Sequence, residues 1–152
     1  MNERKRSILI VESDSMVMTF YHYVLSDTYR LFITDNMLAV KKIIETKKID
    51  LVILDLSLGR WVDDLLLIRF IRQENANLMT PILGVALNPF QVDRMNVLDA
   101  ECNEYIVQPF DVGILLQTVA KLTCTSNLDQ TTDKILEIEC ENIPVALDII
   151  TH

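Results

Sequence analysis

The sequence contains few of the residues that build metal clusters, disulfide frameworks or phosphate-binding loops. Its 152 residues include only three cysteines, two histidines and three glycines. Cys102, Cys124 and Cys140 lack the CxxC or Cys/His spacing of a zinc site, and their odd number favours reduced thiols. His22 and His152 stand too far from other candidate ligands to suggest a metal site or a catalytic base.

Long apolar runs are also missing. The apolar segment at residues 8–11 is much shorter than the core of a signal peptide or a membrane span. We therefore expect a cytoplasmic protein without a membrane partner. The net charge of −8 repels nucleic acid and anionic membranes, so nucleic acid is not expected as a partner of this chain either.

The composition is that of an ordinary folded domain. Half of the residues are hydrophobic and 24% are charged, which is too apolar for a disordered chain. The length allows one domain and a short extension, and a core of this size can be stable without disulfides.

Short apolar runs alternate with helical patterns along most of the chain. Strands are predicted at residues 7–11, 29–33, 50–55, 81–86 and 105–107, and helices at 15–25, 36–46, 62–72, 89–99 and 111–122. Four of the strands are nearly continuous Ile, Leu and Val, the pattern of parallel strands that helices bury on both faces. The alternation predicts a doubly wound α/β domain, with five parallel strands in the order 2-1-3-4-5 and helices on both faces.

The last thirty residues have a different pattern. Residues 123–132 are polar, whereas residues 136–141 alternate apolar and acidic side chains with the period of a strand that has one wet face. A second apolar stretch follows at 145–150. An extra edge hairpin, an oligomerisation arm and the start of an output domain all fit, so residues 123–152 are predicted to be a linker and C-terminal extension whose role stays open.

Two acidic residues are predicted to meet at one edge of the sheet. Glu12 follows the first strand and Asp55 ends the third, and doubly wound sheets bind ligands at the carboxyl ends of neighbouring strands. With Asp14 close behind, such carboxylates repel one another and favour Mg²⁺, which could also neutralise a phosphoryl group attacked by a carboxylate. Acidic residues also occur at strand ends because loops begin there, which is how we interpret Asp35 and Asp50.

Three segments together resemble the receiver domain of two-component response regulators. They read ILIVESD at 8–14, LVILDLSL at 51–58 and YIVQPF at 105–110. The resemblance covers residues 7–122 with every element in order. It implies a flavodoxin-like fold, a signalling role in a phosphorelay rather than an enzymatic one, and a histidine kinase or phosphotransfer protein as partner. It also allows a homodimer.

The resemblance assigns roles to particular residues. Asp55 matches the aspartate that accepts the phosphoryl group, and Mg²⁺ would be held by Glu12, Asp55 and the backbone carbonyl of Ser57. Tyr105 matches the aromatic position whose rotamer reports activation. Pro109 follows the position of the usual lysine, and a cis peptide bond is implied before it.

Several of these positions depart from the family pattern. Ser13 stands where the second acid of the metal-binding pair is usual, and Asp14 could reach the metal only through water. Ala86 replaces the Ser or Thr that contacts the phosphoryl group, and Gln108 replaces the lysine. A hydroxyl donor and a positive charge are therefore missing. Each such loss costs about two to three powers of ten in rate, so we expect a weakened Mg²⁺ site and slow chemistry.

Two functions remain open at this point. One is a receiver that accepts phosphoryl on Asp55 with weakened chemistry, and the other is a phosphorylation-independent pseudo-receiver that serves as a protein-docking module. Glu12 and Asp55 favour the first, whereas Ser13, Ala86 and Gln108 favour the second. A nucleotide- or flavin-binding enzyme is disfavoured, because the loop after the first strand carries acids and none of the three glycines.

Overall fold

The predicted elements are all present in the protein. The computed structural model describes residues 4–56, 61–73, 79–97 and 102–125, so Ser57 and residues 126–152 lie outside the described residues. In chain order the elements are β1 (Ser7–Val11), α1 (Ser15–Leu25), β2 (Arg30–Thr34), α2 (Met37–Thr46), β3 (Leu51–Asp55), α3 (Trp61–Gln73), β4 (Ile82–Ala86), α4 (Pro89–Val97), β5 (Glu104–Val107) and α5 (Val112–Thr125).

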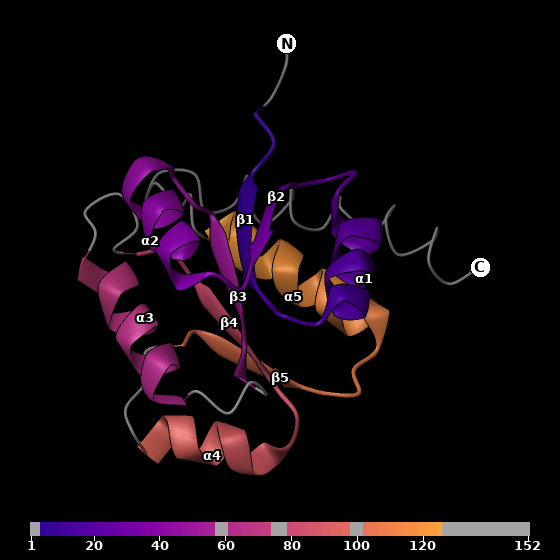
Figure 1. Ribbon diagram of the computed structural model, residues 1–152. Coiled ribbons are helices and arrows are strands. Elements are labelled where there is room, and N and C mark those ends of the chain that lie inside the picture. The colour runs from indigo at the N-terminus through magenta and orange to yellow at the C-terminus, as the bar shows by residue number, and fades with distance from the viewer. Residues whose placement is uncertain (1–3, 57–60, 74–78, 98–101, 126–152) are drawn as a thin grey trace.

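The five strands form one parallel sheet in the order β2-β1-β3-β4-β5, which confirms the predicted topology. Every residue of β1, β3 and β4 is buried, as the continuous apolar runs indicate. Helices α1 and α5 cover one face of the sheet, and α2, α3 and α4 lie on its other side (Figure 1). All parallel strands therefore end at the same edge, where the candidate site lies.

Side chains alternate along the strands between two apolar clusters. Ile10 and Ile53 belong to the cluster under α1 and α5, whereas Val11 and Leu54 belong to the cluster under α2, α3 and α4. Each fully buried Leu or Ile stabilises the fold by about 2 kcal/mol. Because successive residues face opposite ways, the two residues that follow Val11 and Leu54 return to the α1–α5 side.

Polar side chains fix where the helices around this edge begin. The carboxylate of Asp14 accepts hydrogen bonds from the backbone N–H groups of Met16 at 2.8 Å and Val17 at 3.3 Å, which caps α1. Asp111 accepts from the N–H of Gly113 at 2.6 Å and caps α5 in the same way. Such caps contribute about 1 kcal/mol each.

Two sequence expectations need correction. Residues 123–125, predicted to begin a linker, are the last turn of α5; the hydroxyl of Thr123 is buried and donates to the carbonyl of Val119 at 2.8 Å. Cys124 is disulfide-bonded, contrary to the expectation of reduced thiols, whereas Cys102 is free. Counting cysteines could not reveal this, because pairing depends on which residues the fold brings together. No helix among the described residues is long and apolar enough to span a bilayer.

Candidate functional site

Strand register brings Glu12 and Asp55 together. In the pairing of β1 with β3, Val11 lies opposite Leu54, so the next residues, Glu12 and Asp55, are also opposite each other. The backbone N–H of Glu12 donates to the carbonyl of Thr34 at 3.2 Å, which continues the sheet one residue further. Both acids are buried, with 2% and 4% of their surface exposed. The predicted convergence of the two carboxyl groups is therefore observed.

The environment of Glu12 favours its protonated form. Burial is the main cause that raises the pKa of Glu12 from 4.5 to about 7, and the charge of Asp55 and a hydrogen bond between the two side chains raise it further. Two backbone N–H groups, those of Ser13 and Asp14, each donate to Oε1 of Glu12 at 3.0 Å and act in the opposite direction. A hydrogen bond between two carboxyl groups needs a proton, so the pair holds one near neutral pH.

Of the other expected metal ligands, the structure describes only Asp14. Asp14 caps α1 with its carboxylate and is exposed. No group of three or more Asp, Glu, His or Cys side chains able to hold a metal is found within the described ranges. Two buried carboxyl groups nevertheless suit a hard divalent cation once the shared proton is lost, because the charge of the cation removes the repulsion between the carboxylates. Ser57, the third expected ligand, lies outside the described residues.

The expected switch positions lie at the ends of β4 and β5. Ala86 is fully buried, and its carbonyl accepts from the backbone N–H of Gln108 at 2.7 Å. The bond between Gln108 and Pro109 is cis, as the resemblance implies. The ring of Tyr105 packs over Gly84, where a methyl group would lie only 2.7 Å from Tyr105 Cδ1. Tyr105 therefore depends on a glycine in the neighbouring strand.

Gln91 of α4 was not predicted as a site residue from the sequence, although its side chain connects the segments that follow β3 and β4. Its side-chain oxygen accepts from the backbone N–H of Leu87, and its Nε2 donates to the carbonyl of Leu56 at 3.3 Å. Leu56 follows Asp55, and Leu87 follows Ala86. A polar residue in the first turn of a predicted helix gives no sequence signal for such a bridge.

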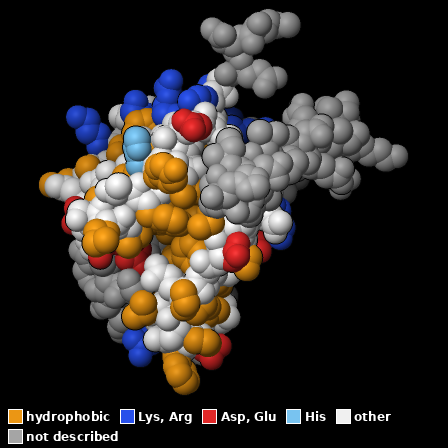
Figure 2. All heavy atoms as spheres, turned by 90° about the vertical axis from the view of Figure 1, so that its right-hand side faces the viewer, with side chains coloured by type: hydrophobic (Ala, Val, Ile, Leu, Met, Phe, Trp, Pro, Cys, Tyr) orange, Lys and Arg blue, Asp and Glu red, His pale blue; other side chains and the backbone are white. Residues whose placement is uncertain are grey.

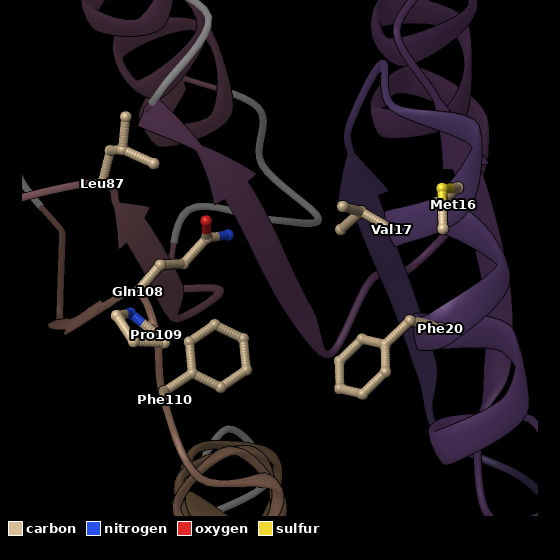
Figure 3. Close-up of a pocket in the computed structure, with 7 residues that line it drawn as sticks. All are labelled: Met16, Val17, Phe20, Leu87, Gln108, Pro109 and Phe110. Atoms are coloured by element: carbon tan, nitrogen blue, oxygen red, sulfur yellow. The ribbon is translucent and has the colours of Figure 1, made fainter.

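An apolar pocket of about 570 Å³ opens at the same edge, between α1 and the segment that joins β5 to α5 (Figure 3). It is lined by Met16, Val17, Phe20, Leu87, Gln108, Pro109 and Phe110. The centroids of the Phe20 and Phe110 rings lie 6.4 Å apart. The side chain of Met16 is 81% exposed. Figure 2 shows apolar side chains gathered on this side of the molecule. The pocket was also missed, because the helical spacing of Val17 and Phe20 indicates only a core-facing stripe.

Comparisons with known proteins agree with this geometry. A family model described as the response regulator receiver domain matches residues 8–120. The transcriptional regulatory protein KdpE of the Escherichia coli KDP operon is 31% identical over 110 residues, which are 72% of this chain and 47% of that protein. The response regulator ArlR of Staphylococcus epidermidis is 33% identical over 115 residues, 74% of this chain and 50% of that protein. The chain thus spans about half the length of these curated relatives.

Solved structures give the same answer for the fold. The receiver domain of a Pseudomonas aeruginosa sensor histidine kinase, with magnesium in its active-site cleft, matches with a TM-score of 0.68 and 25% identity over 79% of this chain and 98% of that one. A chemotaxis response regulator of Vibrio cholerae matches with a TM-score of 0.68 and 16% identity over 78% of this chain and 99% of that one.

The fold, the paired acids and the family match together define the class of protein. The chain belongs to the response regulator receiver domain family, with the flavodoxin-like arrangement of its chemotaxis members. It is a receiver domain of two-component signalling, and the docking-module alternative is not favoured.

Proposed function

We propose that this receiver accepts a phosphoryl group on Asp55 within a phosphorelay, with slower chemistry than the family pattern would give. The observation that carries the proposal is the buried pair of Glu12 and Asp55, held opposite each other by strand register at the carboxyl edge of the sheet. Asp55 is the proposed nucleophile because it matches the phosphoacceptor position of the family and ends β3, at the centre of the sheet. It receives one phosphoryl group as a signal, so the chain is proposed to be a signalling module and not a turnover enzyme.

Mg²⁺ fits the donor set of this edge. Glu12 and Asp55 would bind it directly, the carbonyl of Ser57 is the predicted third protein ligand, and Asp14 could contribute through water. When bound, the ion supplies charge neutralisation for the transferring phosphoryl group. The site is proposed to be weak, since Ser13 adds no carboxylate and Glu12 must lose its proton before it can bind.

The missing donors explain why slow transfer is expected. Ala86 has no hydroxyl for a phosphoryl oxygen, and Gln108 has no positive charge. Phosphoryl transfer depends mainly on positioning and charge neutralisation, so each loss lowers the rate directly. The same losses weaken the interaction of a phosphoryl group with the end of β4. Phosphorylation is therefore expected to shift the rotamer of Tyr105 less.

The proposed phosphodonor is a histidine kinase or a phosphotransfer protein that docks beside the acids. The apolar pocket between α1 and the start of α5 lies at the same edge and exposes Met16 and Leu87. Apolar exposed patches of this kind favour protein partners. Four further expectations are still predictions. They are a cytoplasmic location, a homodimer, a receiver domain bounded at residues 7–122, and an open role for the linker and C-terminal extension predicted at residues 123–152.

Intact-mass spectrometry tests the proposal. The protein is incubated with acetyl phosphate and Mg²⁺, alongside an Asp55→Asn variant. The wild type should gain the mass of one phosphoryl group over a long incubation, and the variant should gain none. No adduct on the wild type at high donor concentration would contradict the proposal and favour a phosphorylation-independent docking role.

A further inference from the structure

Tyr21 carries a buried hydroxyl group without a hydrogen-bond partner among the described residues. The residue lies on α1 inside the apolar cluster under α1 and α5, and only 1% of its surface is exposed. Buried hydroxyl groups are nearly always paired, because leaving one unpaired costs stability. A phenylalanine would fill this space without that cost, so the hydroxyl calls for an explanation outside packing.

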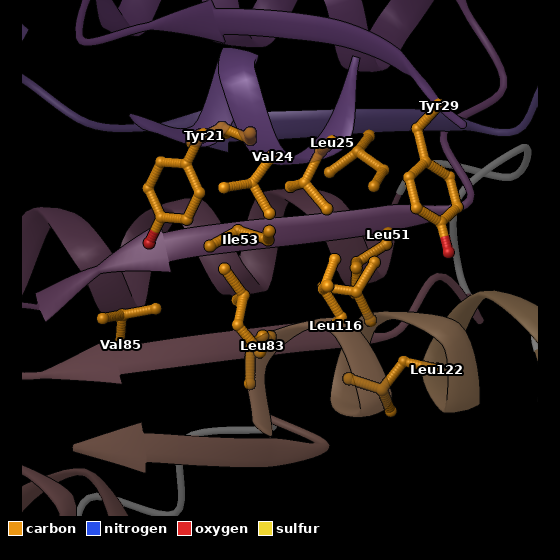
Figure 4. Close-up of a cluster of buried hydrophobic side chains, with 14 of the residues drawn as sticks. Tyr21, Val24, Leu25, Tyr29, Leu51, Ile53, Leu83, Val85, Leu116 and Leu122 are labelled. Carbon is orange, nitrogen blue, oxygen red and sulfur yellow. The ribbon is translucent and has the colours of Figure 1, made fainter. Parts of the chain in front are cut away.

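The hydroxyl of Tyr21 points toward the acid pair. Helix α1 starts at the carboxyl edge of the sheet, and helical side chains lean back toward the start of their helix. Figure 4 shows the hydroxyl directed to the end of β3 and near Val85, which is the residue paired with Asp55 in β4. The charges of Glu12 and Asp55 also act on this hydroxyl, since both raise the pKa of Tyr21.

The protonation state of Tyr21 suits a donor. Burial raises the pKa of Tyr21 well above its usual value, and the charges of Glu12 and Asp55 raise it further. The hydroxyl therefore keeps its proton at neutral pH. It can donate a hydrogen bond to a carboxylate, and it adds no negative charge beside the two acids.

We propose that Tyr21 is a positioning residue of the acid pair, whose hydroxyl donates a hydrogen bond to a carboxylate of Glu12 or Asp55 when the pair binds Mg²⁺. The predicted effect of Tyr21 on the rate of adduct formation rests on the proposed phosphoacceptor role of Asp55, whereas its predicted effect on Mg²⁺ affinity does not.

The argument follows from the position of the hydroxyl. The carboxyl groups of Glu12 and Asp55 are hydrogen-bonded to each other, and the hydroxyl of Tyr21 is buried beside them and directed to the end of β3. A divalent cation between the two carboxylates would take the place of the hydrogen bond that joins them. A neutral donor held in the apolar cluster under α1 and α5 would then hold a carboxylate in place.

A second tyrosine provides a matched control. Tyr29 belongs to the same apolar cluster and is 6% exposed, but it lies toward the opposite end of the strands (Figure 4). Its hydroxyl has a partner, the side chain of Thr123. Tyr29→Phe thus removes a hydrogen bond far from the acids, whereas Tyr21→Phe removes a hydroxyl near them that has no partner in the part of the chain that the structure describes.

The test compares the full chain with Tyr21→Phe and Tyr29→Phe. Isothermal titration with Mg²⁺ alone gives the metal affinity, intact mass after acetyl phosphate gives the rate of adduct formation, and urea unfolding gives stability. Tyr21→Phe should weaken Mg²⁺ binding and slow adduct formation by about tenfold each, with an unchanged or higher urea midpoint. Tyr29→Phe should lower the urea midpoint and leave both other measurements unchanged.

Each outcome decides the inference. Equal Mg²⁺ affinity in the wild type and Tyr21→Phe overturns it, as does a lowered urea midpoint in that variant, which would reveal a structural partner. If the wild type binds Mg²⁺ but forms no adduct, the phosphoacceptor role of Asp55 fails, and the Mg²⁺ comparison alone still decides the role of Tyr21. A wild type that neither binds Mg²⁺ nor forms an adduct overturns both.

Discussion

At the scale of single residues, the proton held by Glu12 and Asp55 governs how the protein responds to pH. The two acids sit where a metal and a phosphoryl group are proposed to bind, yet burial makes their doubly ionised state costly. The resting protein and the metal-bound protein therefore prefer different protonation states. Low pH favours the protonated pair of the resting protein, and Mg²⁺ favours the ionised pair.

The pKa of Glu12 gives the sign of this dependence. The folded value of about 7 lies above the ordinary value of 4.5, so the folded protein keeps a proton that the unfolded chain has already lost. Stability from this proton is complete below about pH 4.5 and is lost as pH rises through 7. Metal-free protein should lose on the order of 2 kcal/mol of unfolding free energy between about pH 5 and pH 8.

Urea unfolding in EDTA across this range measures the effect, with Glu12→Gln as the comparison. Glutamine cannot titrate, so the slope should flatten in the variant. An unchanged slope in Glu12→Gln would assign the pH dependence to another group and contradict the shared proton.

Gln108 offers a gain of function at the same scale. Gln108→Lys supplies the positive charge that the family pattern has at this position, and adduct formation from acetyl phosphate should speed up by about tenfold or more. Gln117→Lys, on the exposed side of α5, changes the net charge equally and should leave the rate unchanged. Equal acceleration by both variants would show a general charge effect instead.

At the scale of elements, β4 and β5 depend on each other through Gly84 and Tyr105. Gly84→Ala places a methyl group 2.7 Å from Cδ1 of Tyr105 and 3.1 Å from Cδ1 of Leu56. The ring must move, and the variant should lose about 1–3 kcal/mol of unfolding free energy. Urea unfolding measures the loss, and near-ultraviolet circular dichroism follows the ring.

Replacing the tyrosine ring with a leucine side chain provides the control for this contact. A Gly84→Ala, Tyr105→Leu double variant should lose less stability than the two single variants combined, because the clash disappears with the ring. Strict additivity would show that Gly84 and Tyr105 do not interact as the structure indicates.

The elements themselves were predictable because most strands are nearly continuous apolar runs and the segments between the strands have a helical period. The end of α5 was not, because its final residues are polar and only the buried hydroxyl bond of Thr123 reveals the last turn. The meeting of Glu12 and Asp55 followed from strand order. Tyr21 and Gln91 could not be found, because a helical apolar period and a polar first turn have ordinary structural explanations.

At the scale of the whole molecule, Mg²⁺ should stabilise the fold by mass action, because the proposed site at the acid pair exists only in the folded chain. Thermal unfolding with and without about 10 mM Mg²⁺ should show a higher midpoint with metal, and a larger rise at about pH 8 than at pH 5, where Glu12 is protonated. Asp55→Asn should abolish the rise. A rise of equal size in that variant would place the metal elsewhere on the molecule.

The most direct test of the central claim is the position of the phosphoryl group. Asp55 is the last residue of β3, and Asp50 directly precedes the strand. Asp50 is also buried, but its carboxylate accepts a hydrogen bond from the backbone N–H of Ser7 at 2.7 Å, at the opposite end of the strand. Intact mass after acetyl phosphate and Mg²⁺ should show one adduct on the wild type and on Asp50→Asn, and none on Asp55→Asn. An adduct that persists in Asp55→Asn would contradict the account, because the phosphoryl group would then be on another residue.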